Sequence, residues 1–333
     1  MSESGDYTPA AHWGGHSFTD AKRAYRATAD ASLSEAKKRN IDPKGLFPKT
    51  MSTKSESPLV IGFDVTASMD DWPVTICSKL PYLEFEGQEY LGDGMEISWC
   101  AFGDSQYDKY PFQAQKFCKG KALKTKLDKL VHERGGGGNS CESYDLAARF
   151  YSQNCQMPEA IRKPIFIFIC DEGIYSSPNA DEWTNTGGEG DWETDMAALC
   201  QKFSVYCIRK NYHNQDRKVH DQWIKTLGKD RVVRLQDPNR VVDVIFGLLA
   251  QETGRIDYFE DELAERQGAD SDGDEKIAIV MKSLHSVHGV NRKSVKKIAG
   301  PVGGGKSKSV AVKGSKRKKT DKGKGKSISL MDD

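Results

Sequence analysis

The chain has 333 residues, enough for one large α/β domain with appended segments, since single domains of ~200 to 250 residues are ordinary in this class. Hydrophobic residues make up 37% of it and its mean hydropathy is −0.64, which is low for a wholly compact chain and predicts polar ends. No run of about 18 apolar residues could span a bilayer, and the polar start MSESGDYTPA is unlike a signal peptide. We therefore expect a cytoplasmic protein with no membrane contact.

Charge is divided unevenly along the chain, although the formal net charge is only +1. Residues 291–333 hold 14 of the 49 Lys and Arg but only three of the 48 Asp and Glu, so this tail carries about +11 and residues 1–290 about −10. The tail consists largely of Lys, Gly and Ser, which predicts disorder. A solubilising tail or an arm that docks on an acidic protein is one interpretation of this run of charges; the alternative is nucleic-acid binding, which would be nonspecific and strongly salt-dependent.

The eight cysteines are spread over the chain and none lies in a C-x-x-C pair, which argues against a disulfide framework. Several, such as Cys100 and Cys170, lie in apolar runs, where a free thiol behaves as a small core residue. This usage is typical of a reducing cytoplasm. His285 and His288 could share a helix face, but they have no acidic or thiol partner at a matching spacing, so we assign no metal to them.

The amino-terminal arm contains an Ala-rich stretch, residues 17–40, which predicts one or two helices. Ser17 or Thr19 can cap its start and Asp42-Pro43 ends it. The predicted parts of the chain are an arm (1–56), a folded domain (57–254), an acidic helical extension (255–290) and a basic disordered tail (291–333).

The folded domain begins with an apolar stretch that ends abruptly in oxygen-bearing side chains. Residues 59–63, LVIGF, follow Pro58 and predict a strand buried on both faces. Asp64, Thr66 and Ser68 then alternate along a tight turn, so their oxygens can converge beyond the carboxyl end of the strand, where open α/β sheets bind ligands. These hard donors suit Mg²⁺, with Mn²⁺ or Ca²⁺ as alternatives, and suit zinc or copper poorly. Helix capping by Asp64 is the other interpretation.

Strands and helices alternate through the rest of the domain, which predicts a doubly wound, mostly parallel six-stranded sheet with helices on both faces. Residues 109–117 alternate apolar and polar side chains and predict one antiparallel edge strand. The expected strands are 59–63, 95–103, 109–117, 165–170, 204–208 and 231–235, and the expected helices are 70–83, 120–134, 143–155, 192–203, 215–227 and 239–253.

Two later stretches complete a pattern with the first. Residues 134–144, RGGGGNSCESY, form a Gly-rich loop before a helix, and the apolar strand IFIFIC ends in Asp171. In this order they resemble the motifs of von Willebrand factor A domains. That family begins with D-x-[ST]-x-S, and its metal-ion-dependent adhesion site takes a hydroxyl from a second loop and an aspartate from a third. The resemblance implies the Rossmann-like strand order 3-2-1-4-5-6, in which the strands ending at Asp64 and Asp171 are neighbours.

The resemblance extends to further stretches of the chain. DPKG before the first strand, D-W-P and K-L-P after it, and IFIF-x-x-D-E-G appear in the order found in a group of bacterial and phage A-domain proteins to which no reaction is assigned. This strengthens the expected fold and leaves the biological role open.

The second loop departs from the G-G-T-x-T arrangement that is usual in this family. Gly138 stands where a threonine would supply a metal oxygen. Asn139 and Ser140 are the nearest substitutes, Glu142 is a more distant one, and a bound water is a further alternative. The expected metal ligands are Asp64, Thr66, Ser68, Asn139, Ser140 and Asp171.

The resemblance implies a metal-dependent protein-binding module, an adaptor or scaffold and not an enzyme. In A domains the ion keeps one coordination position open, and an Asp or Glu of a partner protein completes it. The alternative is a phosphatase-like hydrolase with Asp64 as nucleophile. Haloacid-dehalogenase-like phosphatases carry D-x-D at this place, whereas Thr66 here leaves the general acid missing.

Overall fold

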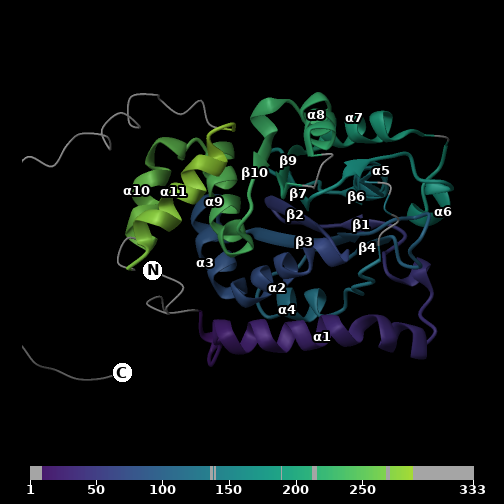
Figure 1. Cartoon of the computed structure of the whole chain (residues 1–333), viewed down its shortest axis with the longest axis horizontal. Coiled ribbons are helices and arrows are strands. Elements are labelled where there is room, and N and C mark those ends of the chain that lie inside the picture. Colours follow the sequence, from purple (N-terminus) through teal and green to yellow (C-terminus); the bar gives the residue numbers. More distant parts are fainter. Residues whose placement is uncertain are drawn as a thin grey trace, which may run out of the picture. The chain divides into compact units, whose positions relative to one another are not determined.

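Six strands form one mostly parallel sheet in the computed structural model of the chain (Figure 1). The structure describes residues 10–135, 138, 140–188, 190–211, 216–267 and 271–287. The strands lie in the order β10-β9-β7-β2-β3-β4, and the β3–β4 edge pair is antiparallel. This confirms the predicted sheet and its order. The strands are β2 (Ser57–Asp64), β3 (Met95–Phe102), β4 (Phe112–Ala114), β7 (Ile165–Cys170), β9 (Ser204–Arg209) and β10 (Val232–Arg234).

Helices cover both faces of the sheet (Figure 1). One face packs against α2 (Asp71–Ser78), α3 (Leu80–Leu91), α4 (Ala122–Leu127) and α9 (Val241–Glu252), and the other against α5 (Tyr144–Asn154), α7 (Trp192–Lys202) and α8 (Asp216–Leu227). Outside these layers, α1 (Phe18–Lys38) lies along α2, and α10 (Ile256–Gln267) and α11 (Gly273–Leu284) pack against α9. None of the helices in the described ranges is long and apolar enough to cross a membrane.

Short elements complete the described structure. Two pairs of two-residue strands lie outside the main sheet, and both are parallel. These pairs are β1 (Met51–Ser52) with β6 (Cys155–Gln156), and β5 (Cys141–Glu142) with β8 (Gly173–Ile174). The short helices are η1 (Ala11–Trp13), η2 (Pro43–Gly45), η3 (Ala67–Met69), α6 (Ala180–Thr184), η4 (Lys229–Arg231) and η5 (Pro238–Arg240).

The central strand β2 is buried along its whole length, between β3 on one side and β7 on the other. Its side chains alternate between the two cores, so Ile61 packs on the face of α2 and α9 while Val60 packs on the face of α5. Gly62 leaves room for the Phe102 ring, because a Cβ at this position would lie 2.7 Å from it. The buried central strand therefore fixes the position of Asp64 at the carboxyl edge of the sheet.

Within the amino-terminal arm, the stretch 17–40 forms one α-helix, α1, which agrees with one of the two predicted outcomes. The Ser17 hydroxyl accepts a hydrogen bond from the backbone N–H of Asp20 and caps α1. Farther along, the Tyr25 hydroxyl lies 2.9 Å from Nε2 of His132, and both side chains are buried. The arm is thus attached to the domain through its own apolar and polar contacts.

Two predicted helices differ from the observed ones. The helix expected over 70–83 is divided into α2 and α3, because Pro81 has no N–H to continue the hydrogen-bond ladder and instead lies in the first turn of a new helix. The helix expected over 120–134 is limited to α4. The Gln113 side chain bonds both the N–H and the carbonyl of Val131, which holds that segment out of the helix.

Candidate metal centre

Three loops meet at the carboxyl edge of β2 and β7. The first follows Asp64, the second is the Gly-rich loop, and the third begins at Asp171. The N–H of Arg134 donates to the carbonyl of Val65 at 3.1 Å, which joins the second loop to the first. The N–H of Gly173 donates to the carbonyl of Ser140 at 2.9 Å, and the parallel β5–β8 pair extends this junction between the second and third loops.

Asp64 is fully buried at the end of β2. Its Oδ1 accepts a hydrogen bond of 2.7 Å from the backbone N–H of Thr66, and its Oδ2 accepts one of 2.9 Å from the Tyr144 hydroxyl. Burial and the nearby charge of Asp171 raise the pKa of this carboxyl to about 8, although both hydrogen bonds oppose the shift. A positive charge beside Asp64 would favour its ionised form.

The two hydroxyls predicted to bind metal lie together above Asp64. Thr66 Oγ1 and Ser68 Oγ are 3.2 Å apart, and Thr66 is buried while Ser68 is exposed. The Lys210 ammonium donates a hydrogen bond of 2.5 Å to the carbonyl of Ser68. The cluster therefore opens to solvent at Ser68, with a lysine at its rim.

Asp171 is buried beside this cluster. Its Oδ1 has no hydrogen-bond partner in the described part of the chain. Burial raises the pKa of the carboxyl, while hydrogen bonding from Ser68 and the positive charge of Lys210 lower it. Two loops from neighbouring strands thus bring Asp64, Thr66, Ser68 and Asp171 together.

The second loop places the other predicted ligands differently. Asn139 lies outside the described residues, as do the tail 291–333 and His288. Gly138 is exposed with φ +68°, and Ser140 also has positive φ, at 62°. The contact from Ser140 to the third loop is made by its carbonyl oxygen and not by its hydroxyl.

Glu142, the more distant substitute for the missing threonine, has unusual surroundings. The side chain is fully buried, and neither carboxylate oxygen has a hydrogen-bond partner among the described residues. Burial raises its pKa, and the negative charge of Asp64 raises it further. Such a group is rare, because buried polar atoms in native proteins are nearly always paired.

Further residues surround the site, and of these Lys210 had no recognisable signal in the sequence. The Tyr144 hydroxyl and the Lys210 ammonium reach the site from distant positions in the chain. Tyr175 belongs to the long loop after β7, but its hydroxyl lies 2.9 Å from Ser143 Oγ and holds that loop down. Met69 and Trp72 are buried under the first motif.

The donors at this edge fit a hard divalent cation. Carboxylate and hydroxyl oxygens are the ligands that Mg²⁺, Mn²⁺ and Ca²⁺ accept, and the unpaired Oδ1 of Asp171 is an oxygen that a cation would satisfy. Across the described ranges, no three His, Cys, Asp or Glu side chains form a group that could hold an ion by themselves. Any ion here would therefore also need the hydroxyls of Thr66 and Ser68.

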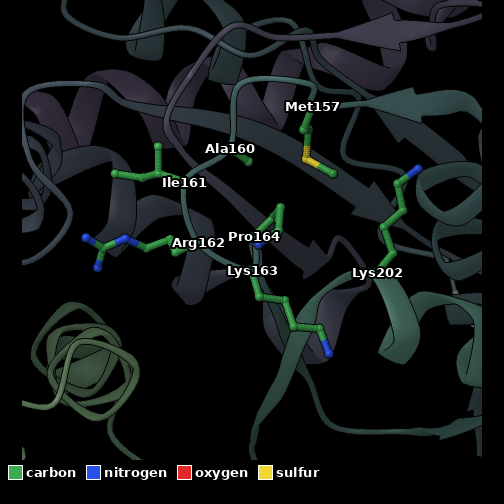
Figure 2. Close-up of a pocket in the computed structure, with 7 residues that line it drawn as sticks. All are labelled: Met157, Ala160, Ile161, Arg162, Lys163, Pro164 and Lys202. Atoms are coloured by element: carbon green, nitrogen blue, oxygen red, sulfur yellow. The ribbon is translucent and has the colours of Figure 1, made fainter.

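A separate pocket of about 450 Å³ lies before the start of β7, at the opposite edge of the sheet (Figure 2). Arg162, Lys163 and Lys202 line it, but Figure 2 shows their side chains pointing in different directions. Lys163 Nζ donates to the carbonyl of Cys200 and Lys202 Nζ to that of Ser152, at 2.8 and 2.9 Å. These cations therefore do not converge on a common ligand position.

Comparison with solved structures gives the following distant likenesses. No family model and no curated protein matches the chain. The pilus adhesin SpaC from Lactobacillus rhamnosus GG, in its open conformation, aligns with 13% identity and a TM-score of 0.41, over 64% of this chain and 31% of the adhesin. Proximal thread matrix protein 1 from the mussel byssus, with a zinc-occupied MIDAS motif, aligns with 10% identity and a TM-score of 0.36, over 60% of this chain and 48% of that protein. The chain thus spans less than half the length of either protein.

Proposed function

We propose that this chain is a metal-ion-dependent protein-binding module of the von Willebrand factor A type, acting as an adaptor and not as an enzyme. The observation that carries the proposal is the buried Oδ1 of Asp171, which has no hydrogen-bond partner in the described residues and lies beside Asp64 and two hydroxyls. A buried carboxylate is costly unless a cation or donor compensates it. The arrangement therefore favours a cation-binding role for this edge of the sheet.

Asp64, Thr66, Ser68 and Asp171 would hold the ion, with Mg²⁺ as the expected cation and Mn²⁺ or Ca²⁺ as alternatives. Once bound, the ion supplies a positive charge that an Asp or Glu of a partner protein can reach. Ser68 is the exposed member of the set, so the partner would approach from its side. The overall charge of residues 1–290, about −10, repels an acidic partner only over roughly 8 Å, because salt screens it beyond that distance.

An exposed aromatic residue stands at the same edge. Tyr107, which is 63% exposed, lies in the loop after β3, the strand that pairs with β2. Its N–H donates to the carbonyl of Asp104, and the N–H of Asp104 donates to Asp108 Oδ2 at 2.9 Å, so the loop is well held. Tyrosines on rigid loops are frequent anchors of protein interfaces. We therefore infer a partner whose acidic residue is flanked by apolar surface that can pack on Tyr107.

The surroundings of Asp64 support a ligand over a nucleophile. Both of its oxygens accept hydrogen bonds from the protein, and the side chain is fully buried at the base of the cluster. A nucleophile must reach its substrate, and an acid must stand near the leaving group. The side chain two positions on is Thr66, which cannot supply a proton as a carboxylic acid would.

The test compares wild type with Asp64→Ala in a thermal shift assay with EDTA, Mg²⁺, Mn²⁺ or Ca²⁺. Wild type is expected to melt at a higher temperature with one of the cations, and Asp64→Ala to lose that increase while still folding. Asp93→Asn, a change of an exposed carboxylate, is the control. Pull-downs with and without EDTA then test the partner. If Asp64→Ala still binds the partner in the presence of EDTA, the interface does not depend on a metal ion.

A further inference from the structure

Glu142 ends the two-residue strand β5, immediately after the Gly-rich loop. Glu142 pairs with Ile174 of β8, a residue of the third loop that follows Asp171 by three positions. The pairing places Glu142 beside that loop. The side chain has no solvent exposure, and in the described residues both carboxylate oxygens lack a hydrogen-bond donor. A carboxylate of this kind costs several kcal/mol to bury in its charged form without compensation. The fold therefore retains an acidic group that it does not itself satisfy.

The largest charge effects on Glu142 come from acidic groups. Asp64 has the largest effect among them, followed by Glu172, Asp104 and Asp108. Their negative charges disfavour ionisation of Glu142, and none of them can donate a hydrogen bond while ionised. A cation is the partner that would satisfy Glu142 and lower its repulsion with Asp64 at the same time.

We propose that Glu142 is a further acidic ligand of the cation at the Asp64 edge, supplying from the second loop the oxygen that Gly138 cannot. This inference rests on the metal-binding role proposed above. In the described residues, no three acidic side chains form a group that could hold an ion alone. Glu142 therefore acts together with the hydroxyls of Thr66 and Ser68. If its carboxylate keeps its present position, it reaches the ion through a bound water.

A third carboxylate near the ion would change the ion selectivity of the site. A carboxylate in place of a hydroxyl gives the site three formal negative charges, from Asp64, Asp171 and Glu142. The gain in attraction over a two-carboxylate site is larger for a trivalent than for a divalent cation, because Coulomb energy scales with the charge. Tb³⁺ is a useful probe, since aromatic side chains such as Tyr144 beside Asp64 can sensitise its luminescence.

The decisive variant is Glu142→Gln, which keeps the shape of the side chain and removes its charge. In EDTA it should melt at the same or a higher temperature than wild type, because glutamine removes the cost of keeping a buried carboxyl group protonated when no cation is bound. Its affinity for Mn²⁺, measured by calorimetry, should fall at least tenfold, and its affinity for Tb³⁺ should fall more. Glu159→Gln, an exposed carboxylate, is the matched control and should leave both affinities unchanged.

Other outcomes overturn the proposal or separate it from the proposed function. Unchanged cation affinity in Glu142→Gln overturns it, as does a lower melting temperature in EDTA with unchanged affinity, which would indicate a packing role. Glu142→Asp keeps the charge and should retain more Mn²⁺ affinity than Glu142→Gln; equal loss in both also overturns it. If Asp64→Ala keeps the cation response while Glu142→Gln loses it, an ion binds at Glu142 but the adhesion-type site of the proposed function is wrong.

Discussion

The Tyr144 hydroxyl donates a hydrogen bond of 2.9 Å to Asp64 Oδ2 within the core. Tyr144 begins α5 directly after the Gly-rich loop, and Asp64 ends β2, so this bond ties the second loop to the first motif. Both side chains are fully buried. The bond orients the Asp64 carboxylate and favours its ionised form, which is the form that binds a cation.

Tyr144→Phe should therefore weaken cation binding at neutral pH. Without the hydroxyl the pKa of Asp64 rises further, so protons compete better with the cation, and affinity should fall several-fold at pH 7 and less at pH 9. The change should also lower stability by about 1 to 3 kcal/mol, because it leaves Asp64 Oδ2 buried without its hydrogen-bond donor. Tyr175→Phe is the control, because its hydroxyl bonds Asp104 and not Asp64. Equal affinities in Tyr144→Phe and wild type across this pH range would contradict the prediction.

Lys210→Gln should strengthen cation binding. The Lys210 ammonium lies at the rim of the cluster, and its positive charge lowers the pKa of Asp171. The same charge would repel a cation bound at the site. Removing a unit charge a few ångströms away should raise affinity by up to roughly tenfold at low salt, and by less at high salt. Mn²⁺ titration at pH 8 measures the change, with Lys225→Gln in α8 as the control. Weaker binding in Lys210→Gln would mean that the lysine supports the site.

The positions of Asp64 and Asp171 at one edge of the sheet could be predicted, because two long apolar strands end at them and the strand order follows from the resemblance. The junction between the second and third loops could not. A two-residue strand such as β5 has too little periodicity to recognise, and its partner β8 is about 30 residues away in the sequence. For the same reason the sequence does not show that Glu142 lies inside the core, because its position there follows from that pairing.

Side-chain contacts over long sequence distances also set the limits of prediction. Nothing near Gln113 indicates that its amide will bond Val131 and end the helix expected over 120–134. The positive φ of Gly138 is another such feature, because a run of glycines permits many backbone conformations and does not select one.

Gly138→Thr should not improve the site, although threonine is the residue that the related motif carries. Gly138 has open space around it, but its φ of +68° is one that a β-branched residue adopts only with strain. We expect a loss of stability of roughly 1 to 2 kcal/mol and no gain in Mn²⁺ affinity. Gly138→Asn is the matched control, since asparagine tolerates this conformation and should cost less. Tighter Mn²⁺ binding by Gly138→Thr, without a loss of stability in urea titration, would show that the loop is free to adopt another conformation.

His132 should make the domain sensitive to acid. It is buried against Tyr25 of α1, and burial, followed by the positive charge of Arg134, lowers its pKa to about 4. Histidine in the unfolded chain has a pKa of about 6.5, so between pH 6.5 and 4 the unfolded chain binds more protons than the folded protein. His132 therefore lowers the free energy of unfolding as the pH falls from 6.5 towards 4, by at most about 1.4 kcal/mol per pH unit, and has no such effect above pH 6.5. Urea titrations at pH 7, 5.5 and 4.5 should show a smaller loss for His132→Gln than for wild type, and parallel losses in both proteins would assign the acid sensitivity to other groups.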